Sequence, residues 1–418
     1  MGVSTFIHDF FKRKGAYIFV AVSVAKVLSF LLSIVLIRLL TKEDYGNLMY
    51  AYTIISFVMP FMGMGIFQSF LKYAPIQKMM YQRKSLFRYT LIVGSLASLF
   101  LGVVLILLAF WITIKMPDAY WYLILFSLLI VSLFIFESVK NYLRIFYLNK
   151  AYARLEIIHA VLVFVLASAL TYTIGALGFV IAMVMVPLLL SLWILLRKNL
   201  LRISQRAFDI APSKLWSFGI YTSFGGLVSQ LMFSVDIISI GNLLEDAKWV
   251  AQYKALSLIP FSLMFLPSVV LKTDFVKLVQ EAKNRTYLLQ YVKNFMVIFL
   301  IGSIFFLLLV YYFDHWFVAR MFGEAYLEQS NLLMIFSVGI VGAFLFRVPF
   351  GNIMVAIGWT KISTVISVVT LIADIILNYF WIQKWGIEGA ALATSLLLWL
   401  SGIAVFIVFL VYISRLKK

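Results

Sequence analysis

The sequence predicts an all-α membrane protein, with about 12 transmembrane helices in two pseudo-symmetric six-helix lobes around a central cavity. Three observations predict this fold. Hydrophobic residues make up 64% of the 418 residues and charged residues only 12%, whereas about a quarter of the residues in soluble domains are charged. Apolar stretches of about 20 residues, the length of one membrane crossing, follow one another along the whole chain. The second half of the chain also repeats features of the first.

The apolar stretches give the expected crossings in order. The first, residues 16–40, is too long for the core of a signal peptide and lacks a small-residue cleavage pattern, so we expect a retained span. Breakers such as Pro60 and Gly63 interrupt some spans, and we expect them to pack against neighbours or line a cavity. The expected spans are 16–40, 46–71, 87–112, 120–139, 155–174, 178–196, 215–242, 249–271, 288–311, 331–356, 362–383 and 389–413.

The connections between these spans alternate in charge. One set carries 25 Lys and Arg residues and the opposite set carries five, while acidic residues concentrate in the opposite set. Because cytoplasmic loops are enriched in Lys and Arg, we expect both termini in the cytoplasm and an even number of crossings. No connection exceeds about 20 residues, which leaves no room for a soluble catalytic domain on either side.

Two features of the first half recur in the second. Gly175–Gly178, between the fifth and sixth spans, returns 211 residues later as Gly386–Gly389, and Lys42–Gly46 has a counterpart in Glu245–Ala251. Six spans per half is an even number, so the halves should share one orientation about an axis along the membrane normal. This is the geometry of an alternating-access carrier. The expected six-helix lobes are residues 1–208 and 209–418.

Four basic residues inside the expected spans are candidates for binding an anionic substrate: Lys26, Arg38, Lys254 and Arg347. A charge at the bilayer centre costs roughly 2.5–3.5 kcal/mol on insertion scales, so retained cations point to a path for something anionic. Two alternatives stay open. Arg38 and Lys254 could extend to the membrane interface, and Lys26 and Arg347 could form internal ion pairs with acidic residues.

Asp236 and Asp374, in the seventh and eleventh spans, are the candidate ion-coupling residues, for H+ or Na+, or else structural partners of the cations. The absence of Cys excludes thiolate metal sites, and we expect no metal site and no cofactor. Walker A, metalloprotease and serine-hydrolase motifs are absent, so energy is expected from ion gradients, the membrane potential or the substrate's own gradient. The net charge of +18 is spread between apolar segments, so no nucleic acid partner is expected.

Further motifs are Arg38–Gly46 (RLLTKEDYG), Val235–Gly241 (VDIISIG), Phe322–Tyr326 (FGEAY), and Asn378 followed by Gly386–Thr394 (GIEGAALAT). On these motifs the chain resembles, over nearly its whole length, the polysaccharide flippases of the multidrug/oligosaccharidyl-lipid/polysaccharide exporter superfamily. These are the Wzx-like transporters of O-antigen and related repeat units. Ala251–Tyr253 departs from the family pattern, which often has Gly at the first of these positions.

The resemblance implies a flippase rather than an enzyme. Its substrate would be an oligosaccharide on undecaprenyl pyrophosphate, moved from the cytoplasmic to the outer leaflet of the bacterial inner membrane during polysaccharide and lipopolysaccharide biosynthesis. Implied partners are membrane lipids, H+ or Na+, and the polysaccharide polymerase machinery. Sugars and pyrophosphate cannot cross hydrocarbon unaided, so a basic cavity open to the bilayer would hold the headgroup, with the four cations as countercharges.

Three rival functions remain at this point. A cation-coupled multidrug exporter of the same superfamily would favour an acidic cavity, which the basic excess argues against. A polytopic glycan polymerase or ligase would need a sizeable outer loop, and the longest outer connection, around residues 314–329, is short. Passive lipid scrambling is compatible with the same sequence.

Overall fold

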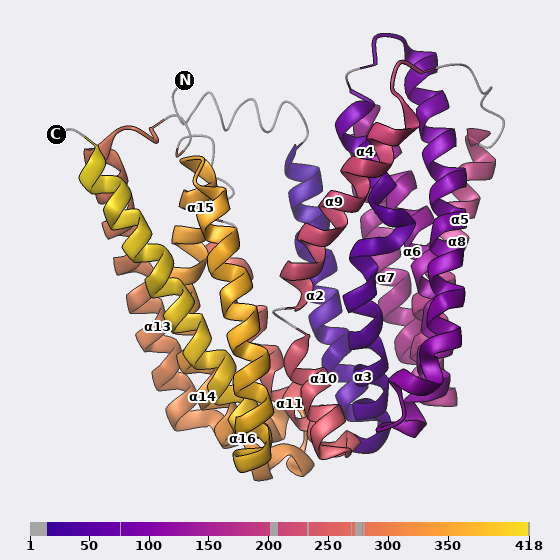
Figure 1. The fold of residues 1–418 in the computed structure, drawn as a ribbon. Helices are drawn as coiled ribbons and strands as arrows, with labels where there is room; N and C mark the ends of the chain where they lie inside the picture. Colours follow the sequence, from indigo (N-terminus) through magenta and orange to yellow (C-terminus); the bar gives the residue numbers. More distant parts are fainter. Residues whose placement is uncertain are drawn as a thin grey trace. The chain divides into compact units, whose positions relative to one another are not determined.

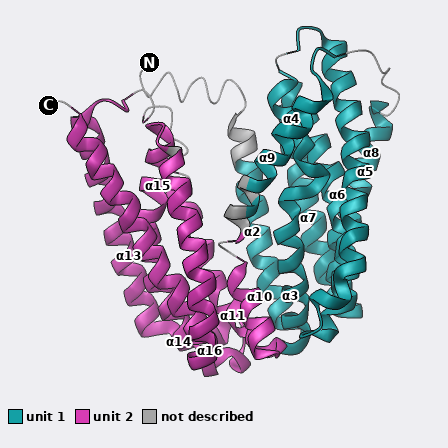
Figure 2. Cartoon of the chain, in the orientation of Figure 1, with its two compact units in different colours: residues 1–230 teal, residues 231–418 magenta. Residues whose placement is uncertain are grey.

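The computed structural model describes residues 15–75, 77–200, 208–231, 234–268, 270–271, 278 and 281–416 (Figure 1). All regular elements in these ranges are helical, which confirms the predicted class. The chain divides into two compact units, residues 1–230 and 231–418 (Figure 2). The predicted lobe boundary at residue 208 divides the two sequence repeats, whereas the boundary at residue 230 divides the compact units. The lobe boundary therefore stays a prediction.

Unit 1 is organised around α6, which packs against α3, α5, α7 and α8, while α2 packs against α7. Phe126 and Phe134 on α6 are fully buried and form part of its aromatic core. The helices of unit 1 are α2 (Gly15–Leu39), α3 (Lys42–Val58), η1 (Met59–Gly65), α4 (Ile66–Tyr73), α5 (Met80–Ile112), η2 (Pro117–Ala119), α6 (Tyr120–Ile145), α7 (Asn149–Ile174), α8 (Ala176–Arg197) and α9 (Pro212–Leu231).

Unit 2 is organised around α16, which packs against α10, α14, η5 and α15. Phe350 and Phe409 are buried in its core. The helices of unit 2 are α10 (Val235–Leu244), α11 (Ala247–Ser262), α13 (Arg285–Met321), η4 (Glu324–Gln329), α14 (Asn331–Gly342), η5 (Ala343–Arg347), α15 (Val348–Ala356) and α16 (Thr360–Arg415).

The predicted crossings coincide with these helices. Within the described ranges, ten helices are long and apolar enough to cross a membrane. Helix α16 contains two of the predicted spans. Its 56 residues would reach about 84 Å in a straight helix, far more than one crossing needs. The backbone breaks at Gly386 (φ 58°, ψ −140°), which separates the two spans. The predicted seventh span is covered by α9 and α10. The chain is therefore a multi-pass membrane protein.

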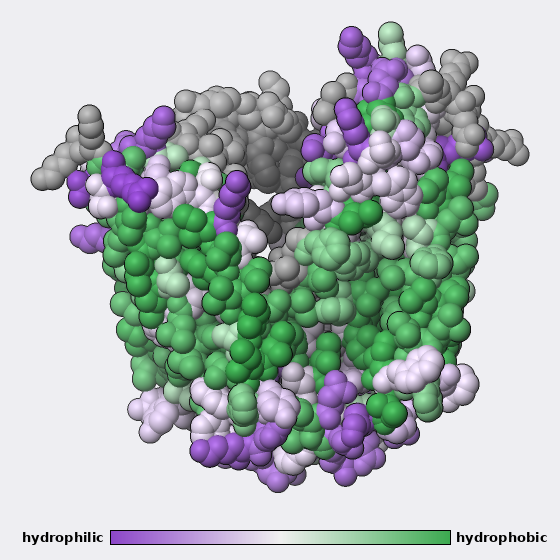
Figure 3. All heavy atoms as spheres, viewed as in Figure 1, coloured by the Kyte–Doolittle hydropathy of each residue, from purple (hydrophilic) through white to green (hydrophobic). Residues whose placement is uncertain are grey.

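The surface and the helix ends agree with this assignment. Figure 3 shows hydrophobic side chains over the middle of the visible face of each unit and hydrophilic ones gathered at the ends. Thr41 caps α3 by accepting a hydrogen bond from the Asp44 N–H at 3.1 Å, and Asp246 caps α11 by accepting from Lys248 N–H at 2.8 Å. These acidic connections therefore begin helices, because carboxylates and hydroxyls satisfy the first unpaired N–H groups.

The predicted break in the second span is a turn inside the helix. Gly63, Met64 and Gly65 all have left-handed backbone angles, and the Gly63 N–H donates to Ser98 Oγ at 2.8 Å. A Cβ atom on Gly65 would lie 2.1 Å from the carbonyl oxygen of Gly219 on α9. The interrupted backbone is thus packed against protein, as expected for a break at membrane depth, and it joins α9 to unit 1.

Candidate functional site

A polar interior site of unit 2 is centred on Asp236, in the first turn of α10. Its carboxylate accepts hydrogen bonds from Tyr253 Oη on α11 (2.6 Å), Thr394 Oγ1 on α16 (2.7 Å) and Asn378 Nδ2 on α16 (2.8 Å). The same Asn378 amide donates to Asp374 Oδ1 at 3.1 Å, one turn away on α16. We call these five residues the Asp236 cluster. It brings together both predicted ion-coupling residues.

The Asp236 cluster is buried and rich in oxygen atoms. Asp236 is 5% exposed, Asp374 6% and Asn378 0%. Within the described part of unit 2, no Lys or Arg nitrogen lies within ion-pair distance of either carboxylate, and Asn378 Oδ1 has no hydrogen-bond partner. Hard cations prefer carboxylate, amide and hydroxyl oxygen ligands. The chemistry of the cluster therefore suits H+ or a small cation such as Na+, with Asp236 and Asp374 supplying the charge.

The repeat supplies an internal comparison for this site. Helices α7 and α16 begin 211 residues apart, at Asn149 and Thr360, and the same spacing separates the hairpin glycines Gly175 (φ 68°) and Gly386 (φ 58°). At this spacing Asp374, Asn378 and Thr394 correspond to Val163, Ala167 and Met183 of unit 1. The same helical positions thus pack with apolar side chains in unit 1, so helix packing does not require the polar residues of the Asp236 cluster.

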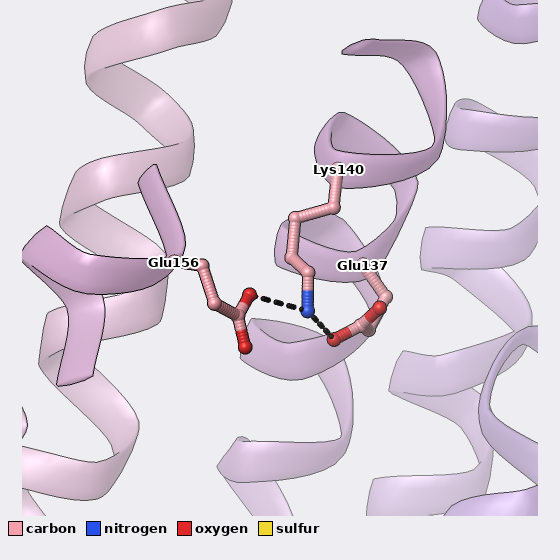
Figure 4. Close-up of polar contacts among 3 residues, drawn as sticks. All are labelled: Glu137, Lys140 and Glu156. Carbon is pink, nitrogen blue, oxygen red and sulfur yellow. Dashed lines mark hydrogen bonds and ion pairs between the residues drawn. The ribbon is translucent and has the colours of Figure 1, made fainter. Parts of the chain in front are cut away.

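Unit 1 contains a different charged cluster, in the C-terminal part of α6 (Figure 4). Lys140 Nζ lies 2.8 Å from Glu137 Oε1 on the same helix and 2.8 Å from Glu156 Oε2 on α7. The side chains of Lys140 and Glu156 are 9% and 15% exposed, and that of Glu137 is 32% exposed. A lysine between two carboxylates is neutralised within the protein, which is how a buried charge is normally tolerated. We call these residues the Lys140 triad.

The four predicted anion-binding residues are distributed over both units. Lys26 and Arg38 on α2 are exposed, and Lys254 on α11 and Arg347 at the end of η5 are partly buried. Arg347 Nη2 donates to Ser367 Oγ on α16 at 2.7 Å. The pairs lie in different units, so their meeting in one cationic cavity stays a prediction. Within the described part of unit 2, Arg347 forms no ion pair with Asp236 or Asp374. An ion pair of Lys26 with either aspartate would join the two units and stays a prediction.

The sequence reasoning missed three residues of these two clusters: Lys140, Tyr253 and Thr394. Lys140 was expected in the loop after a span ending at residue 139, which is wrong, because α6 continues to Ile145 and Lys140 is buried. The spacing of Glu137 and Lys140, three residues apart on a helix, was the available signal. Thr394 belongs to a motif that carries the family resemblance, whereas Tyr253 lies in the segment that departs from the family pattern, and both hydroxyls donate to Asp236.

Comparison with known proteins identifies a family model and a curated relative. Residues 11–271 match the model of the family described as polysaccharide biosynthesis protein. A Shigella flexneri protein named "Putative O-antigen transporter" is 26% identical over 236 residues, which are 56% of this chain and 55% of that protein. The chain thus matches about half the length of this curated relative.

Solved structures share the fold. A lipid II flippase MurJ structure in an inward closed conformation has a TM-score of 0.76 at 15% identity, covering 95% of this chain and 89% of that chain. An inward-facing multidrug resistance MATE family transporter of the MOP superfamily has a TM-score of 0.68 at 17% identity, covering 96% and 99%. At these identities the likeness establishes the fold alone, including the two-lobe arrangement predicted from the sequence.

Proposed function

The chain belongs to the polysaccharide biosynthesis protein family, and from this membership we propose that it is a flippase for lipid-linked oligosaccharides. It moves repeat units attached to undecaprenyl pyrophosphate from the cytoplasmic to the outer leaflet of the bacterial inner membrane. It does so as a carrier and not as an enzyme, by alternating access of the two lobes, residues 1–208 and 209–418. Both termini lie in the cytoplasm, as the charge of the loops indicates.

The Asp236 cluster is the observation that carries the transport function. Two carboxylates, 5% and 6% exposed, occupy the interior of unit 2, where the equivalent positions of unit 1 are apolar. Ionisable residues inside membrane spans are costly and mark ion pathways and proton relays. We assign Asp236 and Asp374 to the binding of one coupling cation, H+ or Na+, whose movement down its gradient drives substrate translocation.

The basic residues serve the anionic part of the substrate. Lys26, Arg38, Lys254 and Arg347 supply countercharge to the pyrophosphate and to acidic sugars in a cationic cavity, while the polyprenyl tail stays in lipid. The polysaccharide polymerase machinery receives the exported repeat units on the outer side.

Complementation tests the flippase function. A strain lacking its own repeat-unit flippase is given the wild-type chain, the Lys26→Ala/Arg347→Ala variant, or no chain, at matched membrane levels, and surface polysaccharide is measured. We expect rescue by the wild type and loss of rescue by the double variant. A wild type that restores export of none of the glycans tested would remove the flippase proposal, and retained rescue by the double variant would remove the anion-binding role of this pair.

A separate measurement tests the coupling role of the Asp236 cluster. The Asp374→Val/Asn378→Ala variant installs the residues found at the equivalent positions of unit 1. Flipping in proteoliposomes is measured with and without a Na+ or pH gradient. We expect one of the two gradients to increase the flipping rate of the wild type, and neither gradient to change the flipping rate of the variant. Equal gradient dependence in the two proteins would refute the assignment.

A cation-coupled multidrug exporter is the second candidate, and the same buried carboxylates favour it, because cationic drugs bind acidic sites. Resistance assays in an exporter-deficient strain distinguish the two functions. Drug resistance without polysaccharide rescue would replace the flippase proposal with this one.

A further inference from the structure

The connection between α4 and α5, at one end of unit 1, is held by polar contacts (Figure 1). The Arg83 side chain donates from Nε to the Gln77 carbonyl oxygen at 3.1 Å. Gln82 Nε2 donates to Asp209 Oδ2 at 2.8 Å, and Gln77 Oε1 accepts from the Asp209 N–H at 3.2 Å. Gln77 and Gln82 are only 4% and 7% exposed, so these contacts fix the connection against the segment before α9. We call residues 77–84 the Met80 tip.

The Met80 tip presents apolar side chains to its surroundings. Met79, Met80 and Tyr81 are 55%, 56% and 45% exposed. Lys78 and Lys84 are exposed on either side of them, and the tip contains no acidic residue. Methionine and aromatic residues are enriched in protein interfaces, and adjacent exposed apolar side chains mark interaction sites. The tip therefore has the composition of a docking surface with a basic rim.

Helix α5 carries this surface out of the membrane. Residues 91–112 contain no charged residue, and as a helix they span about 33 Å, enough for the hydrocarbon core. Met80 precedes Leu91 by 11 residues, or about 16 Å along the helix. Even with the hydrocarbon edge at Arg88, Met80 lies about 12 Å outside it, whereas the headgroups add only about 5–8 Å on each side. The apolar side chains of the tip thus face water, and lipid does not cover them.

The side of the membrane points to the occupant. Two crossings, α2 and then residues 42–73, precede the tip, so it lies on the same side as the N-terminus. In the proposed function this is the cytoplasmic side, where glycosyl transfer must complete the repeat unit before it is flipped. The polyprenyl tail keeps that product at the membrane surface, so the enzyme works beside the carrier. A tip that rises above the headgroups reaches such an enzyme, and its lysines favour an acidic face.

We propose that the Met80 tip docks the glycosyl-transfer enzyme that completes the lipid-linked repeat unit. Met79 and Met80 enter an apolar pocket of the enzyme, and Lys78 and Lys84 face carboxylates at the rim of that pocket. The inference rests on the proposed function and adds to it a cytoplasmic partner that delivers the substrate. Because the tip lies outside the membrane-spanning segments, it takes no part in translocation itself.

Binding measurements test the docking surface. The full-length chain in nanodiscs is titrated with the purified enzyme that adds the last sugar of the repeat unit exported in the complementation strain. We expect Met79→Ser/Met80→Ser to weaken binding about tenfold or more. Lys78→Glu/Lys84→Glu should slow association and abolish its dependence on salt. Ile114→Ser, 58% exposed just beyond the other end of α5, is the matched control and should change nothing.

A spin label distinguishes the enzyme from other occupants. The chain contains no cysteine, so Met80→Cys gives a unique labelling site. In liposomes that contain phosphatidylglycerol, we expect the label to collide with a water-soluble relaxation agent and to become immobilised when the enzyme is added. Preferential collision with oxygen dissolved in the lipid would place the tip in the membrane and refute the inference. Immobilisation that rises with the density of the chain, without enzyme, would assign the surface to a second copy and refute it equally.

The outcomes separate the inference from the proposed function. A wild type that flips lipid-linked oligosaccharide but does not bind the enzyme refutes the docking role and leaves the flippase function standing. A wild type that binds the enzyme but flips no oligosaccharide removes the flippase function and leaves the contact standing. Met79→Ser/Met80→Ser should flip purified substrate in proteoliposomes at the rate of the wild type, which shows that it is folded. If it does not fold, the binding of Lys78→Glu/Lys84→Glu decides, and unchanged association of that variant refutes the inference.

Discussion

Lys140→Met probes the Lys140 triad directly. The substitution keeps the length of the side chain and leaves Glu137 and Glu156 without their shared cation. Removing one partner of a buried ion pair costs about 3–5 kcal/mol. Because Glu137 is 32% exposed and water can screen it, most of the cost falls on Glu156, and we expect a loss near the lower end, about 3 kcal/mol.

The assay is a double-mutant cycle on the free energy of unfolding in mixed micelles, followed by tryptophan fluorescence. Lys140→Met/Glu156→Gln removes the unpaired buried charge, so we expect it to recover most of the lost stability, with a coupling energy of about 1.5 kcal/mol or more. A Lys140→Met variant as stable as the wild type, or a double variant no more stable than the single one, would refute the reasoning.

Two further predictions concern backbone packing. Gly389→Ala places a Cβ 2.2 Å from the backbone oxygen of Trp381, so we expect it to destabilise the protein by about 1–3 kcal/mol. Gly302→Ala on α13 is the control, because its Cβ meets no atom within 4 Å, and it should stabilise by up to about 1 kcal/mol. The unfolding midpoints of the two variants are compared in one detergent, and equal midpoints would contradict the close approach at Gly389. Ser98→Ala removes the acceptor of the buried Gly63 N–H and should cost about 1–3 kcal/mol, while Ser33→Ala, whose exposed hydroxyl contacts only the Ser29 carbonyl, is the control and should change the midpoint little.

The positions of the spans were predictable because the bilayer sets their length. Each of the twelve expected crossings overlaps one helix or a run of consecutive helices, and the break at Gly386 lies in the connection expected between the eleventh and twelfth spans. The compact units were not predictable in the same way. Helix α9 packs with unit 1 through contacts such as Ser69 Oγ donating to the Leu215 carbonyl at 2.6 Å, and hydropathy carries no information on which neighbour a helix packs against.

The polar sites were predictable as residues but not as groups. Asp236 and Asp374 stood out because carboxylates in spans are costly, yet their bridging by Asn378 depends on the rotation of α10 relative to α16, which a single sequence does not determine. The sequence prediction ended the fourth span at residue 139, because a charged residue such as Lys140 lowers the local hydropathy. In the structure the two carboxylates neutralise that charge and the helix continues through it.

The duplication separates residues that the fold requires from residues that are available for function. Where both repeats need the same backbone, they keep the same solution, as in the left-handed hairpin glycines Gly175 and Gly386. Where they differ, the fold tolerates both kinds of side chain: Val163 and Ala167 of unit 1 occupy the repeat positions that hold Asp374 and Asn378 in unit 2. Carboxylates at positions that pack well with apolar side chains cost stability, so their presence in unit 2 requires a reason other than packing. Cation coupling is the reason we propose, and it places the energy-transducing machinery in the interior of unit 2.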